Sequence, residues 1–273
     1  MKKRFATLAM LPAMLIGFWP LIAQEKITVA AAASGAAEGL DLTAVGELFK
    51  SSANLEAFER ALNDPDVGVN NLDLDADGKV DFIRVVEETG EGVHLIILQV
   101  PLAENEFQDV ATIEVEKTGA EQYSMQVHGN DIVYGTDYYV TPSDVHIHRW
   151  PIIAILYGPV YRPYRSIFYF GHYPNWWRLH VPLAFHVYRA RTIKIVGRNA
   201  FTVVKNTRVT GVARVHYIPR SSTHFRNNAK AVRPAGGTVP VRKKTDKPAR
   251  IKHERAKESQ QKGGTREKPD RRH

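Results

Sequence analysis

The chain has 273 residues, no cysteine, 44 % hydrophobic residues and a formal net charge of +8. This length and apolar content predict one or two domains with a real core and argue against global disorder. The absence of cysteine excludes disulfides, thiolate zinc sites, cysteine nucleophiles and a lipid-modified N-terminal cysteine.

The modest net charge conceals a separation of acidic from basic residues. Residues 24–144 hold 24 acids and six bases, a net charge of −18, whereas residues 145–273 hold 28 bases and five acids, a net charge of +23. No Asp or Glu occurs from residue 145 to residue 245. We therefore expect a domain boundary near residue 144, and a basic half that attracts polyanions.

The N-terminus resembles a secretory signal. Three bases, Lys2, Lys3 and Arg4, precede an apolar run over residues 5–23 that contains two prolines and ends in alanine. We expect cleavage of residues 1–23 and export to the periplasm or outer cell envelope; an uncleaved inner-membrane anchor is the alternative, since about 20 apolar residues can span a bilayer. Residues 24–40 are rich in Ala and Gly and are expected to form a spacer.

The folded pattern begins at Asp41. This residue is a candidate N-cap for a helix whose apolar residues recur at helical spacing from Leu42 to Phe49. A second helix is predicted from Asn54, and it should end before Pro65, because the residue ahead of a proline disfavours helix.

Short β-rich runs follow and predict an antiparallel meander. The runs are 80–88, 93–102, 109–117, 122–129 and 131–135. Within 109–117, Val110, Thr112, Glu114 and Glu116 alternate with apolar residues, so one face of that strand should be wet and acidic. Residues 41–144 are therefore expected to form an acidic α+β domain. A nearby group of acids, Glu104, Glu106 and Asp109, is expected to be solvated.

The sharpest chemical signal is an Asp-rich loop of the pattern D-x-D-x-D-G-x-x-D. Its carboxylates are Asp73, Asp75, Asp77 and Asp81. Alternate residues of a tight loop can direct several hard oxygen ligands at one Ca²⁺ ion, Gly78 permits the turn, and Lys79 can offer its backbone carbonyl. The predicted metal ligands are Asp73, Asp75, Asp77, Lys79 and Asp81. A solvated Asp/Gly turn is the alternative reading.

This loop resembles the calcium loops of the EF-hand-like superfamily. The twelfth position carries Arg84 instead of a bidentate Glu, and a predicted strand follows, so the loop is more similar to dockerin and integrin-repeat loops, in which a ninth-position Asp closes the coordination sphere. The resemblance implies a structural Ca²⁺ ion without a paired helix-loop-helix. Four further acids were considered as completing ligands: Glu87, Glu88, Asp64 and Asp66.

A wider resemblance covers residues 50–190. The loop, the 108–117 strand and the later YRPYR and YPNWWR strings are similar to a group of uncharacterised exported bacterial envelope proteins. This resemblance implies export and no established activity.

Residues 145–219 are expected to be an aromatic and basic β-rich region, with strands at 185–190, 191–196, 200–205 and 212–217. Exposed aromatics beside arginines can bind sugars or lipid headgroups, while the guanidinium groups bind phosphate or carboxylate. The predicted anionic-surface residues are Arg149, Arg162, Arg165, Trp176, Trp177 and Arg178. The alternative is a second hydrophobic cluster with arginine stems packed on rings. Residues 220–273 are expected to be a disordered basic tail.

Together these features predict an α+β protein with N-terminal helices, a calcium loop and an antiparallel meander. The expected function is that of a non-catalytic envelope protein with structural Ca²⁺, whose basic aromatic half binds an anionic envelope polymer or lipid surface. One alternative is an assembly protein whose acidic and basic halves meet within or between chains. Another is a hydrolase acting on envelope polymer, although the sequence contains no common hydrolase signature. Nucleic-acid binding fits export poorly.

Overall fold

The computed structural model describes residues 35–197, 200–223 and 225–227. The predicted signal peptide, the first part of the predicted spacer and most of the predicted basic tail lie outside these residues. All described residues belong to one compact unit.

Both predicted N-terminal helices are confirmed. Helix α1 (Leu42–Ser51) has Asp41 as its N-cap, and the Asp41 carboxylate accepts a hydrogen bond from the Thr43 amide at 2.9 Å. Helix α2 (Leu55–Leu62) begins at Asn54, whose side chain accepts from the Ala57 amide. Side-chain acceptors at these N-caps satisfy amides that have no partner within the helix.

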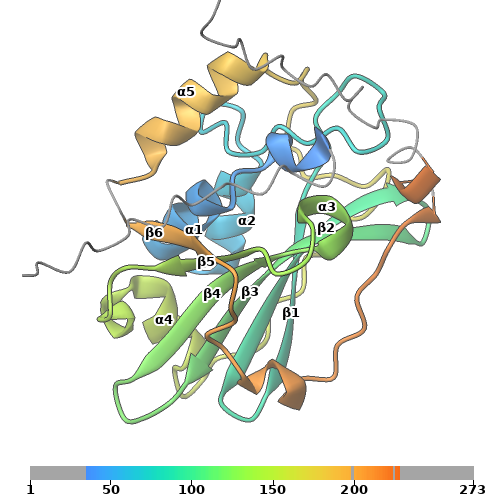
Figure 1. Cartoon of the computed structure of the whole chain (residues 1–273). Coiled ribbons are helices and arrows are strands. Elements are labelled where there is room, and N and C mark those ends of the chain that lie inside the picture. Colours follow the sequence, from blue (N-terminus) through green and yellow to red (C-terminus); the bar gives the residue numbers. More distant parts are fainter. Residues whose placement is uncertain (1–34, 198–199, 224, 228–273) are drawn as a thin grey trace, which may run out of the picture. The chain divides into compact units, whose positions relative to one another are not determined.

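Six antiparallel strands form one sheet in the order β1–β2–β3–β4–β5–β6, which confirms the α+β class (Figure 1). Their bounds are β1 Arg84–Gly90, β2 Val93–Ala103, β3 Glu106–Lys117, β4 Tyr123–Gly129, β5 Tyr139–Pro142 and β6 Phe201–Val204. Helices α1, α2 and α4 (Pro151–Leu156) bury their apolar side chains against one face of this sheet. We call this the inner face and the opposite one the outer face.

Several expected strands are helical instead. Residues 131–135 form helix α3 (Asp131–Tyr134), because the Asn130 side chain accepts from the Ile132 amide and caps it. The two runs expected at 185–190 and 191–196 form the single helix α5 (Phe185–Ile195), in which Tyr188 and Thr192, one helical turn apart, are buried. The run expected at 212–217 begins as the 3₁₀ helix η3 (Gly211–Arg214).

The charge boundary near residue 144 does not divide the fold. Strand β5, from the acidic half, pairs with β6, from the basic half, with Val140 opposite Val203. The 3₁₀ helix η2 (Ile147–Arg149) and α4 lie between these strands in the chain, and Ile152 and Ile153 enter the same core as α1. The acidic and basic halves therefore build one sheet and one main core.

The predicted spacer is also too long. Residues Gly35–Gly39 form the 3₁₀ helix η1, and Leu40 is fully buried and pairs with Asn70 in a β-bridge. A Cβ atom at Gly39 would lie 2.8 Å from the Asn71 carbonyl oxygen, so this close approach requires glycine. The packed structure thus begins before Asp41.

The expectation of a wet acidic face on β3 is wrong. Glu114 and Glu116 are only 3 % and 8 % exposed, and Thr112 is also buried. Val110 lies in the inner core, because a β-bulge between β2 and β3 shifts the alternation there.

The outer face is covered by residues 205–222, which we call the strap. In Figure 1 the strap runs from β6 across β4 and β3 to η3. The Arg208 amide donates to Gln126 at 2.6 Å, and the Arg220 amide donates to Asp109 at 2.7 Å, so both ends of the strap bind side chains of the sheet. From Thr112 to Glu116 the side chains alternate as predicted, but a later part of the chain, and not solvent, covers this face.

None of the helices in the described part of the chain has both the length and the apolar character needed to cross a membrane.

Candidate metal centre

The Asp-rich loop lies between the helical segment and β1, and its own side chains shape it. Asp73 accepts a hydrogen bond from the Gly78 amide at 3.0 Å, Asp75 from the Asp77 amide at 3.1 Å, and Asp77 from the Lys79 amide at 2.8 Å. Gly78 has a φ of 82°, a conformation in which glycine is unstrained. These local bonds fold residues 73–81 into a tight turn.

Three carboxylates of the loop converge. Ligand atoms of Asp73, Asp75 and Asp81 all lie within 4.8 Å of one another, and no other group of three acidic or histidine side chains among the described residues does so. The Oδ1 atom of Asp73 is buried and has no hydrogen-bond donor in the described part of the chain. These three residues could hold a metal ion.

The convergence of these carboxylates affects the pKa values of the loop. Burial, with a smaller contribution from the Asp75 and Asp73 charges, raises the pKa of Asp81 to about 8, although the hydrogen bond from the Leu74 amide lowers it. Burial, followed by the Asp75 and Asp77 charges, also raises the pKa of Asp73. A bound cation would oppose these effects, because it favours the charged carboxylates.

The structure separates the predicted ligands into two groups. Asp77 is exposed and lies outside the converging set, with one oxygen accepting the Lys79 amide. The four acids considered as completing ligands also lie outside it. Glu87 accepts from Tyr161 and Tyr164, Glu88 pairs with Arg165, and Asp64 accepts the Asp66 amide.

Residues 161–183, which we call the aromatic segment, lie directly beside the loop. The Val80 amide donates to the His180 carbonyl oxygen at 2.9 Å, and the Leu183 amide donates to Asn71 at 2.6 Å. Four rings of the segment surround Phe82, with centroids 5.5 to 6.1 Å from it: Phe168, Tyr173, Trp176 and Trp177. The loop and the aromatic segment therefore share a packed boundary.

The aromatic segment is also attached along β1 through two buried acids. Glu87 accepts from the Tyr161 hydroxyl at 2.5 Å and the Tyr164 amide at 2.7 Å. Glu59 accepts from the Val85 amide and the Ser166 hydroxyl, and burial raises its pKa to about 7. Sequence reasoning missed Glu59, although its position four residues after Leu55 and three before Leu62 places it on the apolar stripe of α2.

The six predicted surface residues have different environments. Arg149, Arg162 and Arg178 are exposed, and Arg165 is exposed but paired with Glu88 at 2.5 Å. Trp176 and Trp177 are half-buried against Phe82, so they belong mainly to the packed cluster.

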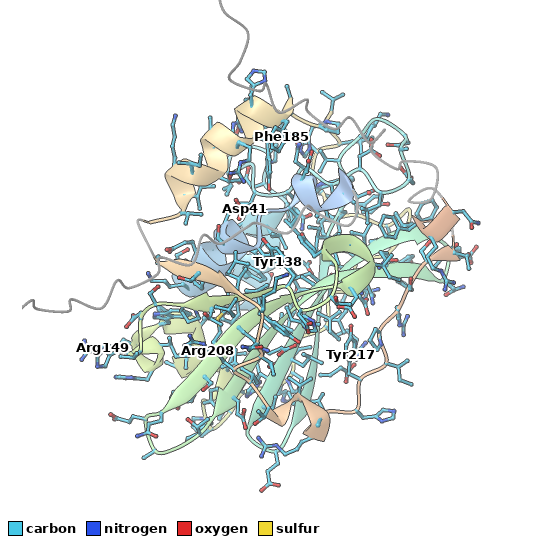
Figure 2. All side chains as sticks on the ribbon, in the orientation of Figure 1. Asp41, Tyr138, Arg149, Phe185, Arg208 and Tyr217 are labelled. Atoms are coloured by element: carbon cyan, nitrogen blue, oxygen red, sulfur yellow. The ribbon has the colours of Figure 1, made fainter. Side chains whose placement is uncertain are left out.

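The aromatic segment nevertheless exposes other apolar side chains. Of the thirteen large apolar side chains that the described residues expose, all except Ile132 lie within 145–219. Those of the aromatic segment are Ile167, Tyr169, Phe170, Leu179 and Val181. Figure 2 shows Arg149 near α4 and Phe185 on α5, at different sides of the molecule.

Comparison with known proteins gives no match: no family model, no curated protein and no solved structure matches this chain.

Proposed function

We propose that this chain is an exported, non-catalytic envelope protein in which Ca²⁺ bound by residues 73–81 stabilises the attachment of the aromatic segment. The observation that carries the proposal is the convergence of Asp73, Asp75 and Asp81 within 4.8 Å. Hard carboxylate oxygens on a turn of alternating ligands suit Ca²⁺, which takes six to eight oxygen ligands in flexible geometry. The remaining ligands would be loop carbonyls and water. Export rests on the N-terminal sequence alone.

A cation at this position has a direct structural consequence. It would relieve the repulsion among the three carboxylates and fix the backbone that leads to Val80, whose amide binds the aromatic segment. Because a ligand that binds only the folded state stabilises it by mass action, calcium should raise the melting temperature.

Thermal unfolding of residues 24–273 with calcium and with a chelator tests this proposal. We expect a higher melting temperature in calcium for the natural sequence, loss of this difference in Asp75→Asn, and its retention in Asp66→Asn, which removes an exposed acid outside the converging group. An unchanged melting temperature in the natural sequence, or an equal loss in both variants, would overturn the calcium site.

We further propose that the aromatic segment binds an anionic lipid surface. The segment exposes the apolar side chains of Ile167 and Phe170 as well as the base Arg162, which supports a lipid over a purely ionic polymer, since apolar side chains enter a headgroup layer while arginine binds phosphate. The segment itself contains no Asp or Glu.

Co-sedimentation with vesicles tests the lipid surface. We expect retention on phosphatidylglycerol vesicles, weakening with salt and lowered by Phe170→Ser, and none on phosphatidylcholine vesicles. The matched control is Ile155→Ser on α4, which should bind like the natural sequence. Binding to a soluble anionic polysaccharide without vesicle binding would replace the lipid by a polymer, and failure of both would remove this function.

A second candidate function is assembly through the opposite charges of the two halves. It is favoured by three ion pairs that already join these halves within the chain: Arg165 with Glu88, Arg189 with Asp41, and Arg214 with Glu116. A mass in light scattering that grows with concentration and collapses in high salt would support assembly between chains. A monomer at every concentration would count against it.

A further inference from the structure

A half-open cavity of about 460 Å³ lies between the outer face of the sheet and the strap. Its floor includes Leu95, Glu114 and His128 from three adjacent strands, and Val212 and Tyr217 of the strap lie over it. In Figure 2, Tyr217 lies beside the part of the strap that follows η3. The volume falls within the range of about 300 to 1,000 Å³ that is usual for small-molecule sites.

The strap is held on both sides of this cavity. At one side the amides of Thr210 and Gly211 donate to Glu116 at 3.2 and 3.1 Å. At the other side the Tyr217 hydroxyl donates to Asp109 at 2.8 Å. A Cβ atom at Gly211 would lie 2.6 Å from the Val93 side chain, so glycine is needed for this close contact. The cavity is therefore a built feature with fixed walls on both sides.

The chemistry of the lining is acidic and apolar. Three carboxyl groups, of Asp109, Glu114 and Asp131, line the cavity, and neither Lys nor Arg does. Most of the remaining surface is apolar, including Ile132 and Val212. This combination is opposite in charge to the basic half from which the strap comes, and it suits a ligand with a cationic donor and an apolar body.

His128 and Asp131 provide a specific place for that donor. The Nδ1 atom of His128 is 3.2 Å from Glu114 Oε1, and its Nε2 atom is 4.0 Å from Asp131 Oδ1. With the proton on Nδ1, Nε2 is an acceptor that faces a second acceptor across a distance too long for a direct hydrogen bond. Tyr139 stacks on the His128 ring at 4.4 Å and holds its orientation. A donor between the two acceptors would bind both.

We propose that this cavity binds a small organic amine, with its ammonium group between His128 and Asp131 and its apolar body against Ile132 and Val212. An ammonium group carries three donors and no acceptor, which matches the lining. This site is separate from the calcium loop and does not depend on it.

Calorimetry and amide chemical-shift mapping of residues 24–273 test the proposal with three probes that share one ring: 2-phenylethylamine, 2-phenylethanol and phenylacetate. We expect 2-phenylethylamine to bind most tightly, phenylacetate to bind least, and the amide shifts to centre on Ile132 and Val212. Asp131→Asn should weaken amine binding about three- to tenfold and leave the alcohol unchanged. The control Glu121→Gln removes an exposed acid outside the cavity and should change neither.

Val212→Phe provides a second variant, because it fills the cavity and should abolish binding of all three probes. No binding of the amine, equal binding of the three probes, or equal weakening by Asp131→Asn and Glu121→Gln would each overturn the proposal. A calcium titration of the same samples distinguishes failure of the amine site from failure of the calcium site, because the two sites have no residue in common.

Discussion

The Asp-rich loop and the outer face of the sheet both gather carboxylates, but the two regions differ in what surrounds these groups. In the loop, Asp73, Asp75 and Asp81 face one another. On the outer face, Asp109 and Glu116 each accept hydrogen bonds from the strap, including two backbone amides at Glu116. Buried charge is tolerated where donors or a counter-ion accompany it. The outer face finds its partners in the strap, whereas the converging loop carboxylates accept amides of the loop itself and could additionally hold a metal ion.

The largest expected effect comes from removing an outer-face acceptor. Asp109→Ala would leave the donors of Gln99, Tyr217 and Arg220 without their shared acceptor in a buried place. We expect the free energy of unfolding to fall by about 2 to 4 kcal/mol, measured by urea denaturation. Because this loss has nothing to do with metal, it should be the same in calcium and in chelator. A loss that calcium repairs would contradict the distinction between the two regions.

A smaller effect should separate the regions by hydrogen exchange. Calcium should slow exchange of the Leu74 and Val80 amides by about tenfold or more, which corresponds to about 1.4 kcal/mol. The Leu74 amide binds Asp81 within the loop, and the Val80 amide belongs to the loop and binds the His180 carbonyl oxygen. Thr210 and Gly211 in the strap should exchange at the same rate with and without calcium. Equal slowing in both regions would indicate a general effect of the ion on the fold.

A pH-dependent effect, spread over the range in which the carboxyl group titrates, should come from Glu59. Its pKa of about 7 in the folded chain exceeds the ordinary value of 4.5, so its favourable contribution is present at low pH and is lost as pH rises from about 4.5 through about 7. Glu59→Gln should flatten this decline, by at most about 3 kcal/mol. The control is Glu56→Gln, at an exposed acid of the same helix, and this variant should keep the decline in stability with rising pH. An unchanged pH profile in Glu59→Gln would show that its burial costs little.

The smallest effect is expected at the exposed ion pair of Arg165 and Glu88. Both side chains are well exposed, so Arg165→Ala should change the free energy of unfolding by no more than about 0.5 kcal/mol. Loss of several times this amount in a chemical denaturation experiment would mean that Arg165 holds the aromatic segment in place.

The sequence predicted those elements whose position depends on nearby residues, such as helix N-caps and turns. Asp41 and Asn54 cap their helices, and the spacing of turns predicted the meander through β4. The loop carboxylates were also found from sequence, because ligands nine residues apart or less need no tertiary information. Residues 185–196 were predicted as strands, because helix α5 buries only Tyr188 and Thr192. Its sequence therefore has no apolar stripe that would indicate a helix.

The burial of the β3 carboxylates could not be predicted for a different reason. Glu116 and the strap amides that bind it are more than ninety residues apart, and period-two alternation says which side chains share a face but not what covers that face. The same limit applies to Trp176 and Trp177, whose exposure depends on Phe82.

A direct calcium titration by calorimetry tests the central claim most sharply. We expect one Ca²⁺ per chain, with binding lost in Asp81→Asn and kept in Glu114→Gln, which alters a carboxylate of the outer face. No binding to the natural sequence, or binding that survives Asp81→Asn and is lost in Glu114→Gln, would contradict it.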